Sequence, residues 1–252
     1  MNTTERIQRI TSWISHYADT NNIESLVVGV SGGIDSAVVS TLCALTGKPT
    51  HVLSMPIRQR QDQHDRSIDH CIKLLEKYNN VYWETIVLTD AFESFEKLFT
   101  SDNGLAFANS RARLRMTTLY QVAQEKGGIV VGTGNKVEDF GIGFFTKYGD
   151  GGVDISPIAD CLKTEVWDMG QELGVAEEII NAVPTDGLWE DGRSDEEQLG
   201  MSYPELEQAM RYSQSADQPT DTREKQNLIK FLDIQAQVKY KIDPIPVCKL
   251  GE

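Results

Sequence analysis

The run from Ser31 to Ser36 reads Ser-Gly-Gly-Ile-Asp-Ser and brings glycines, hydroxyls and one carboxylate together in a short space. An apolar stretch, Leu26–Val30, precedes it and predicts a buried strand, and helical spacing follows over Ala37–Leu45. A glycine turn between a strand and a helix directs backbone N–H groups and the positive helix end at a phosphate. Two adjacent glycines often mark only a tight turn, but the whole run in this context favours nucleotide binding. No Gly-Lys-Ser/Thr follows the glycines, so the run is not a Walker loop.

A second group of residues that could do chemistry lies later in the chain. Arg111, Arg113 and Arg115 occupy alternate positions of a predicted helix and so cannot all share one helix face. Residues 140–154 contain five glycines, four aromatic residues and a single lysine, Lys147. An irregular segment of this length in a compact domain is typically a functional loop.

Successive strand-then-helix units must position these residues. The apolar strands are predicted at residues 26–30, 51–55, 81–88 and 129–131. Such a succession predicts a parallel sheet with right-handed crossovers. Ligands of these sheets bind beyond the carboxyl ends of the strands, and Asp35 and Thr133 both fall at such ends.

The composition excludes several classes of protein. The chain has 252 residues, 40% of them hydrophobic and 25% charged, which is ordinary for a globular protein. Its formal net charge of −14 argues against a nucleic-acid partner, which needs a basic patch. Its four cysteines are far apart and form no C-x-x-C pair, and the chain has only four histidines, so no zinc site is expected. No apolar run is long enough to span a membrane and no signal-peptide pattern opens the chain, so we expect a cytoplasmic location without a membrane partner.

We expect one domain over residues 1–252, because this length fits one α/β domain with a helical appendage. Its predicted parts are an N-terminal helix at 3–20, a nucleotide-binding core at 24–190 and a helical C-terminal part at 195–252.

A series of motifs in order carries a resemblance to a known family. They are the Ser31–Ser36 loop, Asn109-Ser-Arg-Ala-Arg-Leu-Arg-Met116, Gly132-Thr133 with Glu138, Gly143-Phe-Phe-Thr-Lys-Tyr-Gly-Asp-Gly-Gly152, Val183-Pro-Thr185 and Ser194-Asp-Glu-Glu-Gln-Leu-Gly200. The first motif alone resembles the SGGxDS loop of the ATP pyrophosphatases, which split ATP into AMP and pyrophosphate. Together, over about residues 25–241, the motifs resemble the ammonia-dependent NAD synthetases. One departure is the distance from Glu138 to Lys147, which is one residue longer than the family pattern.

The resemblance implies a fold and a reaction. The fold would be α/β and doubly wound, with a mainly parallel five-stranded sheet, helices on both faces and an adenine nucleotide alpha hydrolase-like topology. The reaction would convert the carboxylate of deamido-NAD into the amide of NAD. A carboxylate is a poor acyl donor, so it would first attack the α-phosphorus of ATP and form an acyl-adenylate with release of pyrophosphate. Ammonia would then displace AMP, and Mg²⁺ would neutralise the departing pyrophosphate.

The resemblance also implies roles for individual residues. Asp35, Lys147 and Lys163 would be catalytic, and Asp35 and Glu138 would be the carboxylate ligands of Mg²⁺. The ATP contacts would come from Gly29, Val30, Ser31, Gly32, Gly33, Ile34, Asp35, Ser36, Thr133, Lys163 and Thr185. The deamido-NAD contacts would come from Arg113, Lys147, Asp154, Tyr240 and Lys241, where Tyr240 stands in place of a histidine that many family members carry.

The partners follow from the same resemblance. We expect ATP, deamido-NAD and free ammonia as substrates, since the chain has no room for an amidotransferase domain, and a homodimer with the deamido-NAD site near the subunit interface. Two alternatives from the same fold remain open, namely another adenylating ATP pyrophosphatase, such as a GMP synthetase or a tRNA-thiolating enzyme, and a non-catalytic nucleotide sensor. The acidic balance opposes a tRNA substrate, and retention of Asp35, Glu138, Lys147 and Lys163 opposes a sensor.

Overall fold

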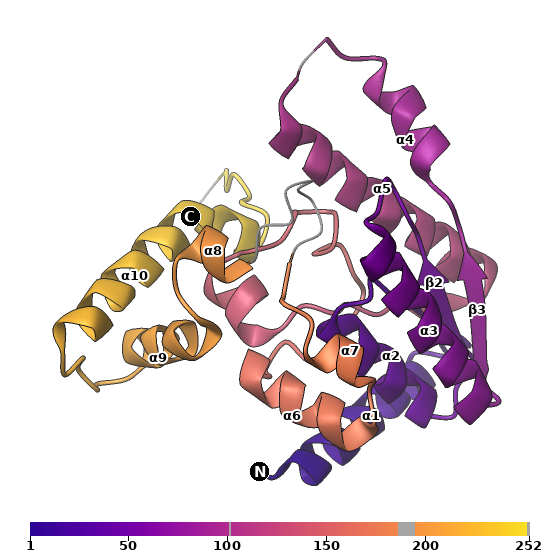
Figure 1. The fold of residues 1–252 in the computed structure, drawn as a ribbon, viewed down its shortest axis with the longest axis horizontal. Coiled ribbons are helices and arrows are strands. Elements are labelled where there is room, and N and C mark those ends of the chain that lie inside the picture. The colour runs from indigo at the N-terminus through magenta and orange to yellow at the C-terminus, as the bar shows by residue number, and fades with distance from the viewer. Residues whose placement is uncertain (101, 186–194, 251–252) are drawn as a thin grey trace.

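The structure is a computed structural model that describes residues 1–100, 102–185 and 195–250. Residues 186–190 of the predicted core and residues 251–252 of the predicted helical part lie outside the described residues. The first half of the chain alternates strands and helices (Figure 1). Its elements are α1 (Thr3–Thr20), β1 (Ser25–Gly29), α2 (Ile34–Leu45), β2 (Thr50–Ser54), α3 (Gln61–Lys77), β3 (Val81–Thr85), α4 (Thr89–Glu96), α5 (Gly104–Glu125) and β4 (Gly128–Val130).

The four strands form one parallel sheet in the order β3-β2-β1-β4. The chain therefore runs outward from β1 to β3 and then returns to place β4 on the other side of β1. This reversal is a topological switch point, and the crevice outside the carboxyl ends of β1 and β4 is the expected place for a ligand.

The prediction of a fifth strand is wrong for the part of the chain that the structure describes, whose sheet has four strands. Beyond β4, only Ile155 pairs with Val131, through a single parallel bridge. Pro157 follows two residues later, and proline has no N–H group with which to extend a ladder. The sheet therefore ends in one bridge where a five-stranded sheet would have a strand.

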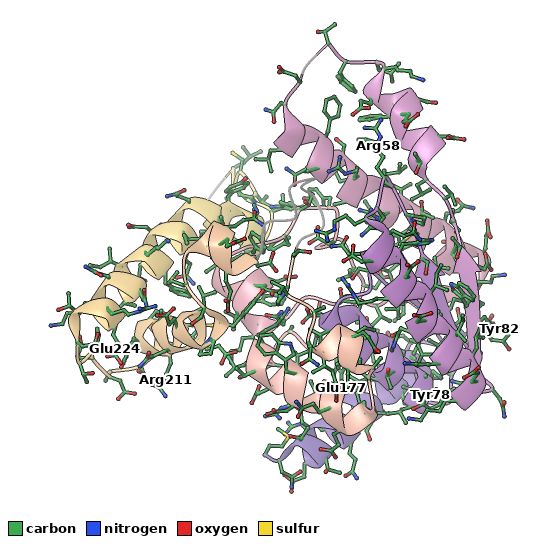
Figure 2. All side chains as sticks on the ribbon, viewed as in Figure 1. Arg58, Tyr78, Tyr82, Glu177, Arg211 and Glu224 are labelled. Carbon is green, nitrogen blue, oxygen red and sulfur yellow. The ribbon has the colours of Figure 1, made fainter. Side chains whose placement is uncertain are left out.

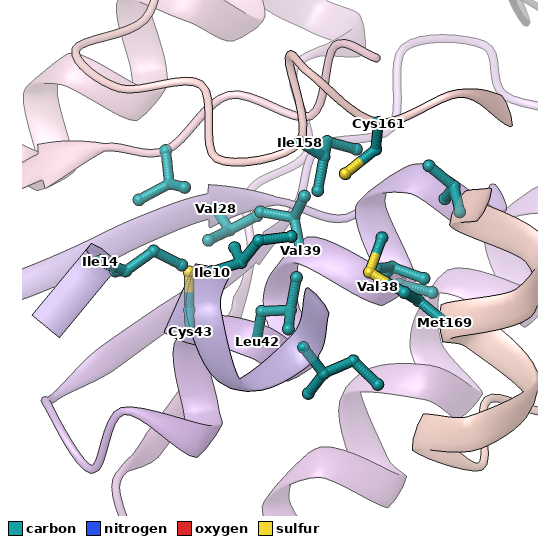
Figure 3. Packing of buried hydrophobic residues seen from close by; sticks show 14 of the residues in the cluster. Ile10, Ile14, Val28, Val38, Val39, Leu42, Cys43, Ile158, Cys161 and Met169 are labelled. Atoms are coloured by element: carbon teal, nitrogen blue, oxygen red, sulfur yellow. The ribbon is translucent and has the colours of Figure 1, made fainter. Parts of the chain in front are cut away.

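Helices cover both faces of the sheet, as expected for a doubly wound fold. Side chains alternate along β1, so that Leu26 and Val28 face α1, α2 and α6, whereas Val27 faces α5. Figure 3 shows Val28 packed with Val39 and Leu42 of α2, and with Ile10 of α1. These contacts place the start of α2, which carries Asp35, rigidly against the end of β1.

The second half of the chain is helical beyond β4. Its elements are the π-helix η1 (Lys136–Gly141), α6 (Lys163–Leu173), α7 (Glu177–Ile180), α8 (Asp195–Leu199), α9 (Tyr203–Gln214) and α10 (Thr222–Ile242). The pair α9 and α10 projects to one side of the sheet (Figure 1). A core that includes Val137, Ile142, Tyr203 and Phe231 joins this pair to η1.

A π-helix lies at the start of the segment between Glu138 and Lys147, where the spacing departs from the family pattern. Its hydrogen bonds span five residues, as from Ile142 N to Val137 O at 3.1 Å, whereas an α-helix spans four. A π turn therefore accommodates one additional residue. The irregular segment expected from Phe140 onward begins inside this helix, and irregular structure starts after Gly141.

Candidate functional site

A cavity of about 780 Å³ opens at the carboxyl ends of β1, β2 and β4. Every predicted site residue lines it except Asp154. These residues come from the end of β1, the loop after it and the start of α2, from α5, from the segments after β4 and after α7, from the start of α6 and from the end of α10. The volume falls within the usual range for small-molecule sites.

The Ser31–Ser36 loop has the geometry of a phosphate cradle. Gly32 has a positive φ of 86°, and a Cβ there would lie 2.4 Å from the Gln63 carbonyl oxygen, so only glycine fits. The Ser31 N–H donates to Ser36 Oγ at 3.2 Å, and Ser36 Oγ donates to Gly33 O at 3.0 Å. No side chain caps the N-terminus of α2, so the N–H groups of its first turn are available to an anion.

Helix α3 supports this loop through residues that the sequence analysis missed. Arg66 Nε donates to Gly32 O at 3.3 Å, and Ser67 Oγ donates to Val30 O at 2.8 Å. From the same helix, Gln63 Nε2 donates to Thr185 Oγ1 at 2.9 Å, and both residues line the cavity. The only sign of these contacts in the sequence is the polar start of this helix. Nothing local in the sequence shows that the helix lies against the loop.

Three predicted residues, Asp35, Glu138 and Lys163, meet in one ion-pair cluster beside the phosphate loop. Lys163 Nζ donates to Asp35 Oδ2 at 2.5 Å and to Glu138 Oε1 at 2.9 Å. The side chains of Lys163, Asp35 and Glu138 are 3%, 18% and 14% exposed, so the cluster is largely shielded from water.

Two further residues, which the sequence analysis missed, complete the cluster. Asn135 Nδ2 donates to Asp35 Oδ1 at 3.1 Å and to Glu138 Oε2 at 2.7 Å. The hydroxyl of Tyr203 donates to Glu138 Oε1. Asn135 could have been suspected from its place after a strand end, whereas no local pattern singles out Tyr203.

Burial and mutual charge set the protonation of the cluster. Burial would lower the pKa of Lys163, but the two carboxylates outweigh it and raise that pKa. The pKa of Asp35 is raised, because burial together with the charge of Glu138 outweighs the attraction of Lys163. Burial also acts to raise the pKa of Glu138, but Lys163 and the hydrogen bonds from Tyr203 and Asn135 lower it overall. Lys163 is therefore a permanent cation next to the phosphate loop.

Asp35 and Glu138 fit a Mg²⁺ ion. They offer hard carboxylate oxygens, and both already contact one shared cation, the Lys163 ammonium. Across the described ranges, His, Cys, Asp and Glu form no group of three or more that could enclose a metal. Mg²⁺ characteristically takes one or two carboxylates and completes its shell with phosphates and water, which matches a two-carboxylate site beside a phosphate loop.

The glycine-rich loop after η1 is held in a compact turn against α5 and α10. Thr146 Oγ1 lies 2.5 Å from Asn109 Oδ1, and Thr146 N donates to Asp150 Oδ1 at 3.0 Å. Lys241 Nζ donates to the carbonyl oxygens of Gly143 and Phe145, both at 2.8 Å. The end of α10 therefore fixes the start of this loop.

The other predicted deamido-NAD residues bond within the chain. Lys147 Nζ donates to Tyr240 O at 2.8 Å, and Arg113 Nε donates to Lys147 O at 3.2 Å. Asp154 accepts from Val130 N at 2.8 Å and from the Tyr120 hydroxyl at 3.0 Å. Arg113, Lys147 and Tyr240 line the cavity, whereas Asp154 stands outside it.

Arg115 is a further cation on the cavity wall. Its Nε donates to Met55 O at 2.9 Å and its Nη2 to Gln59 Oε1 at 3.0 Å. Burial, assisted by the charge of Arg111, lowers its pKa to about 10. Arg115 belongs to the Asn109–Met116 motif, but no role for it was predicted from the sequence.

These features define a class of protein. A glycine loop and an uncapped helix N-terminus lie at a topological switch point, with a lysine and two carboxylates beside them. This is the site of a nucleotide-binding α/β enzyme that acts on phosphates. No helix among the described residues is both long and apolar enough to cross a membrane.

Comparisons with known proteins narrow this class to one family. The NAD synthase family profile matches residues 6–243. The NH3-dependent NAD+ synthetase of Alkaliphilus metalliredigens is 41% identical over 206 residues, which cover 79% of this chain and 82% of that protein. The NH3-dependent NAD+ synthetase of Carboxydothermus hydrogenoformans is 32% identical over 98% of this chain and 99% of that protein. A solved NMN synthetase from Francisella tularensis is 30% identical with a TM-score of 0.87, covering 99% of this chain and 100% of that one. The chain belongs to the NAD synthase family.

Proposed function

We propose that this chain catalyses the ATP-dependent amidation of deamido-NAD with ammonia, which yields NAD, AMP and pyrophosphate. Relatives named NH3-dependent NAD+ synthetase, which match 79% and 98% of this chain, support this reaction. The structural observation that carries it is the Lys163–Asp35–Glu138 cluster beside the phosphate loop. Family membership also separates the chain from the GMP synthetase and tRNA-thiolating alternatives.

The reaction has two steps with balanced bonds. A carboxylate oxygen of the nicotinic acid attacks the α-phosphorus of ATP, and the bond from that phosphorus to the pyrophosphate oxygen breaks. Ammonia then attacks the carbonyl carbon of the adenylate. The bond from that carbon to the AMP oxygen breaks, and the nitrogen loses a proton.

The chain's own residues bind and orient ATP in this proposal. The N–H groups of the Ser31–Ser36 loop and the first turn of α2 hold the phosphates that leave as pyrophosphate. Lys163 turns from the carboxylates toward the phosphates and offsets their charge. Thr133 and Thr185 contact ATP from the segments after β4 and α7.

Asp35 and Glu138 hold Mg²⁺ in this proposal. When bound, Mg²⁺ neutralises charge on the phosphates and helps to orient them. Asn135 keeps both carboxylates pointed at the same place, since its amide donates to each of them.

Arg113, Lys147, Tyr240 and Lys241 line the wall where deamido-NAD would bind. Lys147 and Arg113 are half-buried or exposed and could exchange their bonds to backbone carbonyls for bonds to the substrate pyrophosphate. Asp154 lies outside the cavity, which fits a contact made across a subunit interface.

A second candidate substrate is nicotinic acid mononucleotide. The observation that favours it is the match to an NMN synthetase over 99% of the chain. The chemistry at the carboxylate would be the same, and only the contacts beyond the first phosphate would differ. The two candidates are therefore compared in one assay.

A homodimer is part of the proposal. Exposed apolar side chains gather in one region, namely Phe95 on α4, Leu98 and Phe99 in the segment just after it and Leu105 at the start of α5, and Leu105 also lines the cavity. This region projects from the sheet (Figure 1), and patches of this kind commonly mark protein interfaces. Sedimentation at the monomer mass of 28.2 kDa would contradict the dimer. A cytoplasmic location is consistent with this role in nucleotide metabolism.

The test is a product assay with purified protein, ATP, Mg²⁺ and an ammonium salt. Deamido-NAD and nicotinic acid mononucleotide are supplied in separate reactions, and amide product, AMP and pyrophosphate are measured. Equal amounts of amide, AMP and pyrophosphate from deamido-NAD are expected. Folded protein that makes no amide from either acid would support the nucleotide sensor instead. Glutamine in place of ammonium should give no product.

A further inference from the structure

Tyr203 reaches the ion-pair cluster from a different part of the fold. It is the first residue of α9, and its side chain is fully buried. Its ring meets Trp167 edge-on, with centroids 5.5 Å apart and planes at 89°. Lys163 Nζ lies 5.1 Å from the centre of the same ring. The ring is thus held on two sides, and its hydroxyl has a fixed position.

That hydroxyl lies between two carboxyl groups. It donates to Glu138 Oε1, and Asp195 Oδ2 lies 3.1 Å away. Burial, together with the negative charges of Glu138 and Asp195, raises the pKa of the phenol, so the phenol remains a donor at physiological pH. Asp195 N also donates to Pro184 O at 3.0 Å, next to Thr185. Through Asp195, Tyr203 therefore connects the segment that carries Thr185 to the carboxylate of Glu138.

The orientation of Glu138 depends on such donors. A glutamate side chain has several rotatable bonds, and fixing it costs about 1.5–2 kcal/mol of rotamer entropy. Oε2 is held by Asn135, whereas Oε1 is held by Lys163 and Tyr203. If Lys163 turns toward the phosphates of bound ATP, Tyr203 becomes the donor that still holds Oε1.

We propose that Tyr203 is a positioning residue that holds Glu138 in the orientation in which it binds a divalent cation together with Asp35. The helical part formed by α8, α9 and α10 thereby contributes to metal binding, although it supplies no metal ligand itself. This inference rests on the proposed function of Asp35 and Glu138 as metal ligands. Loss of a hydrogen bond of this kind typically lowers metal affinity by about 10–100-fold.

Tyr203→Phe tests the inference, because it removes only the hydroxyl. Tyr212→Phe is the matched control, since Tyr212 lies on the same helix and donates to Glu224 Oε2 at 3.0 Å. Glu224 lies at the far end of the helical pair from the cavity (Figure 2). Two quantities are measured, namely Mn²⁺ affinity by titration in the presence of ATP and the Mg²⁺ concentration for half-maximal turnover.

We expect Tyr203→Phe to weaken Mn²⁺ binding by about 10–100-fold and to raise the Mg²⁺ requirement similarly, with turnover recovering at high Mg²⁺. Tyr212→Phe should match the wild type in both. Mn²⁺ affinity in Tyr203→Phe that matches Tyr212→Phe would overturn the inference, whatever the melting temperatures. If Tyr203→Phe does not fold, 4-fluorophenylalanine in place of Tyr203 retains the shape without the donor.

The two proposals fail separately. A wild-type chain that makes no amide, combined with weakened Mn²⁺ binding in Tyr203→Phe, would remove the proposed reaction and retain the positioning role. A wild-type chain that makes NAD, combined with unchanged Mn²⁺ binding in Tyr203→Phe, would support the proposed reaction and refute the positioning role.

Discussion

Replacing Lys163 with methionine tests the ion-pair cluster most severely. The ammonium bonds to two carboxylates, and its side chain is only 3% exposed. Lys163→Met leaves Asp35 and Glu138 facing each other without a cation, and removing one partner of a buried ion pair typically costs about 3–5 kcal/mol. For a chain of this size each kcal/mol corresponds to about 2–4 °C, so the melting temperature should fall by roughly 6–20 °C.

A matched control separates this effect from the general loss of a lysine. Lys136 pairs with Asp160, and the two side chains are 33% and 97% exposed. An exposed pair contributes less than about 1 kcal/mol, so Lys136→Met should lower the melting temperature by at most about 4 °C. Both variants are compared with the wild type by differential scanning calorimetry without nucleotide.

Added metal gives the assay its second arm. If Asp35 and Glu138 form the metal site, Mg²⁺ can take the place of the lost ammonium. Millimolar Mg²⁺ without ATP should therefore stabilise Lys163→Met more than the wild type, in which Lys163 competes for the same oxygens. The reasoning is refuted if Lys163→Met melts like Lys136→Met, or if Mg²⁺ shifts the wild type and Lys163→Met equally.

Two other predictions concern the loop and the pH dependence of stability. Gly32→Ala should lower the free energy of unfolding by about 1–3 kcal/mol or more in a urea titration, because Gly32 has a positive φ and an added Cβ would lie 2.4 Å from the Gln63 carbonyl oxygen. Gly33→Ala should not lower it, because an added Cβ there would meet no atom nearer than 3.5 Å. Burial, assisted by the charge of Lys73, lowers the pKa of His70 to about 4. As the pH falls below 6.5, the unfolded chain therefore binds a proton at His70 before the folded chain does. The free energy of unfolding has its full value above that pH and should be about 2 kcal/mol lower at pH 5. Urea titrations across this range should show a smaller slope in His70→Asn.

Each of these has a contradicting result. Equal destabilisation by Gly32→Ala and Gly33→Ala would mean that the conformation of Gly32 does not matter. An unchanged pH slope in His70→Asn would mean that other groups carry the dependence.

Local chemistry made part of the site predictable. The Ser31–Ser36 loop depends on a strand, a glycine with positive φ and a helix start, all within a few residues, and sequence spacing reports such features directly. The span of α1 follows from its periodic apolar residues in the same way. The sequence showed a longer spacing between Glu138 and Lys147 but not the π-helix that begins this segment.

Long-range contacts made the rest unpredictable. Tyr203 and Glu138 are 65 residues apart in the chain, and a buried tyrosine at a helix start has no local mark of its partner. The fifth strand was expected from the family fold, and Pro157 limits it here to one bridge. The bond from Lys147 to the Tyr240 carbonyl likewise depends on how α10 packs against the loop, which no local pattern specifies.

Oxygen-isotope transfer tests the central claim most directly. Deamido-NAD labelled with ¹⁸O in its carboxylate is incubated with the protein, ATP, Mg²⁺ and ammonium, and the products are examined by mass spectrometry. Adenylation makes a carboxylate oxygen the bridge to the α-phosphorus, and attack by ammonia leaves that oxygen on AMP. The account predicts NAD together with AMP that carries one ¹⁸O atom. Label in pyrophosphate or phosphate, or unlabelled AMP formed along with NAD, would contradict it.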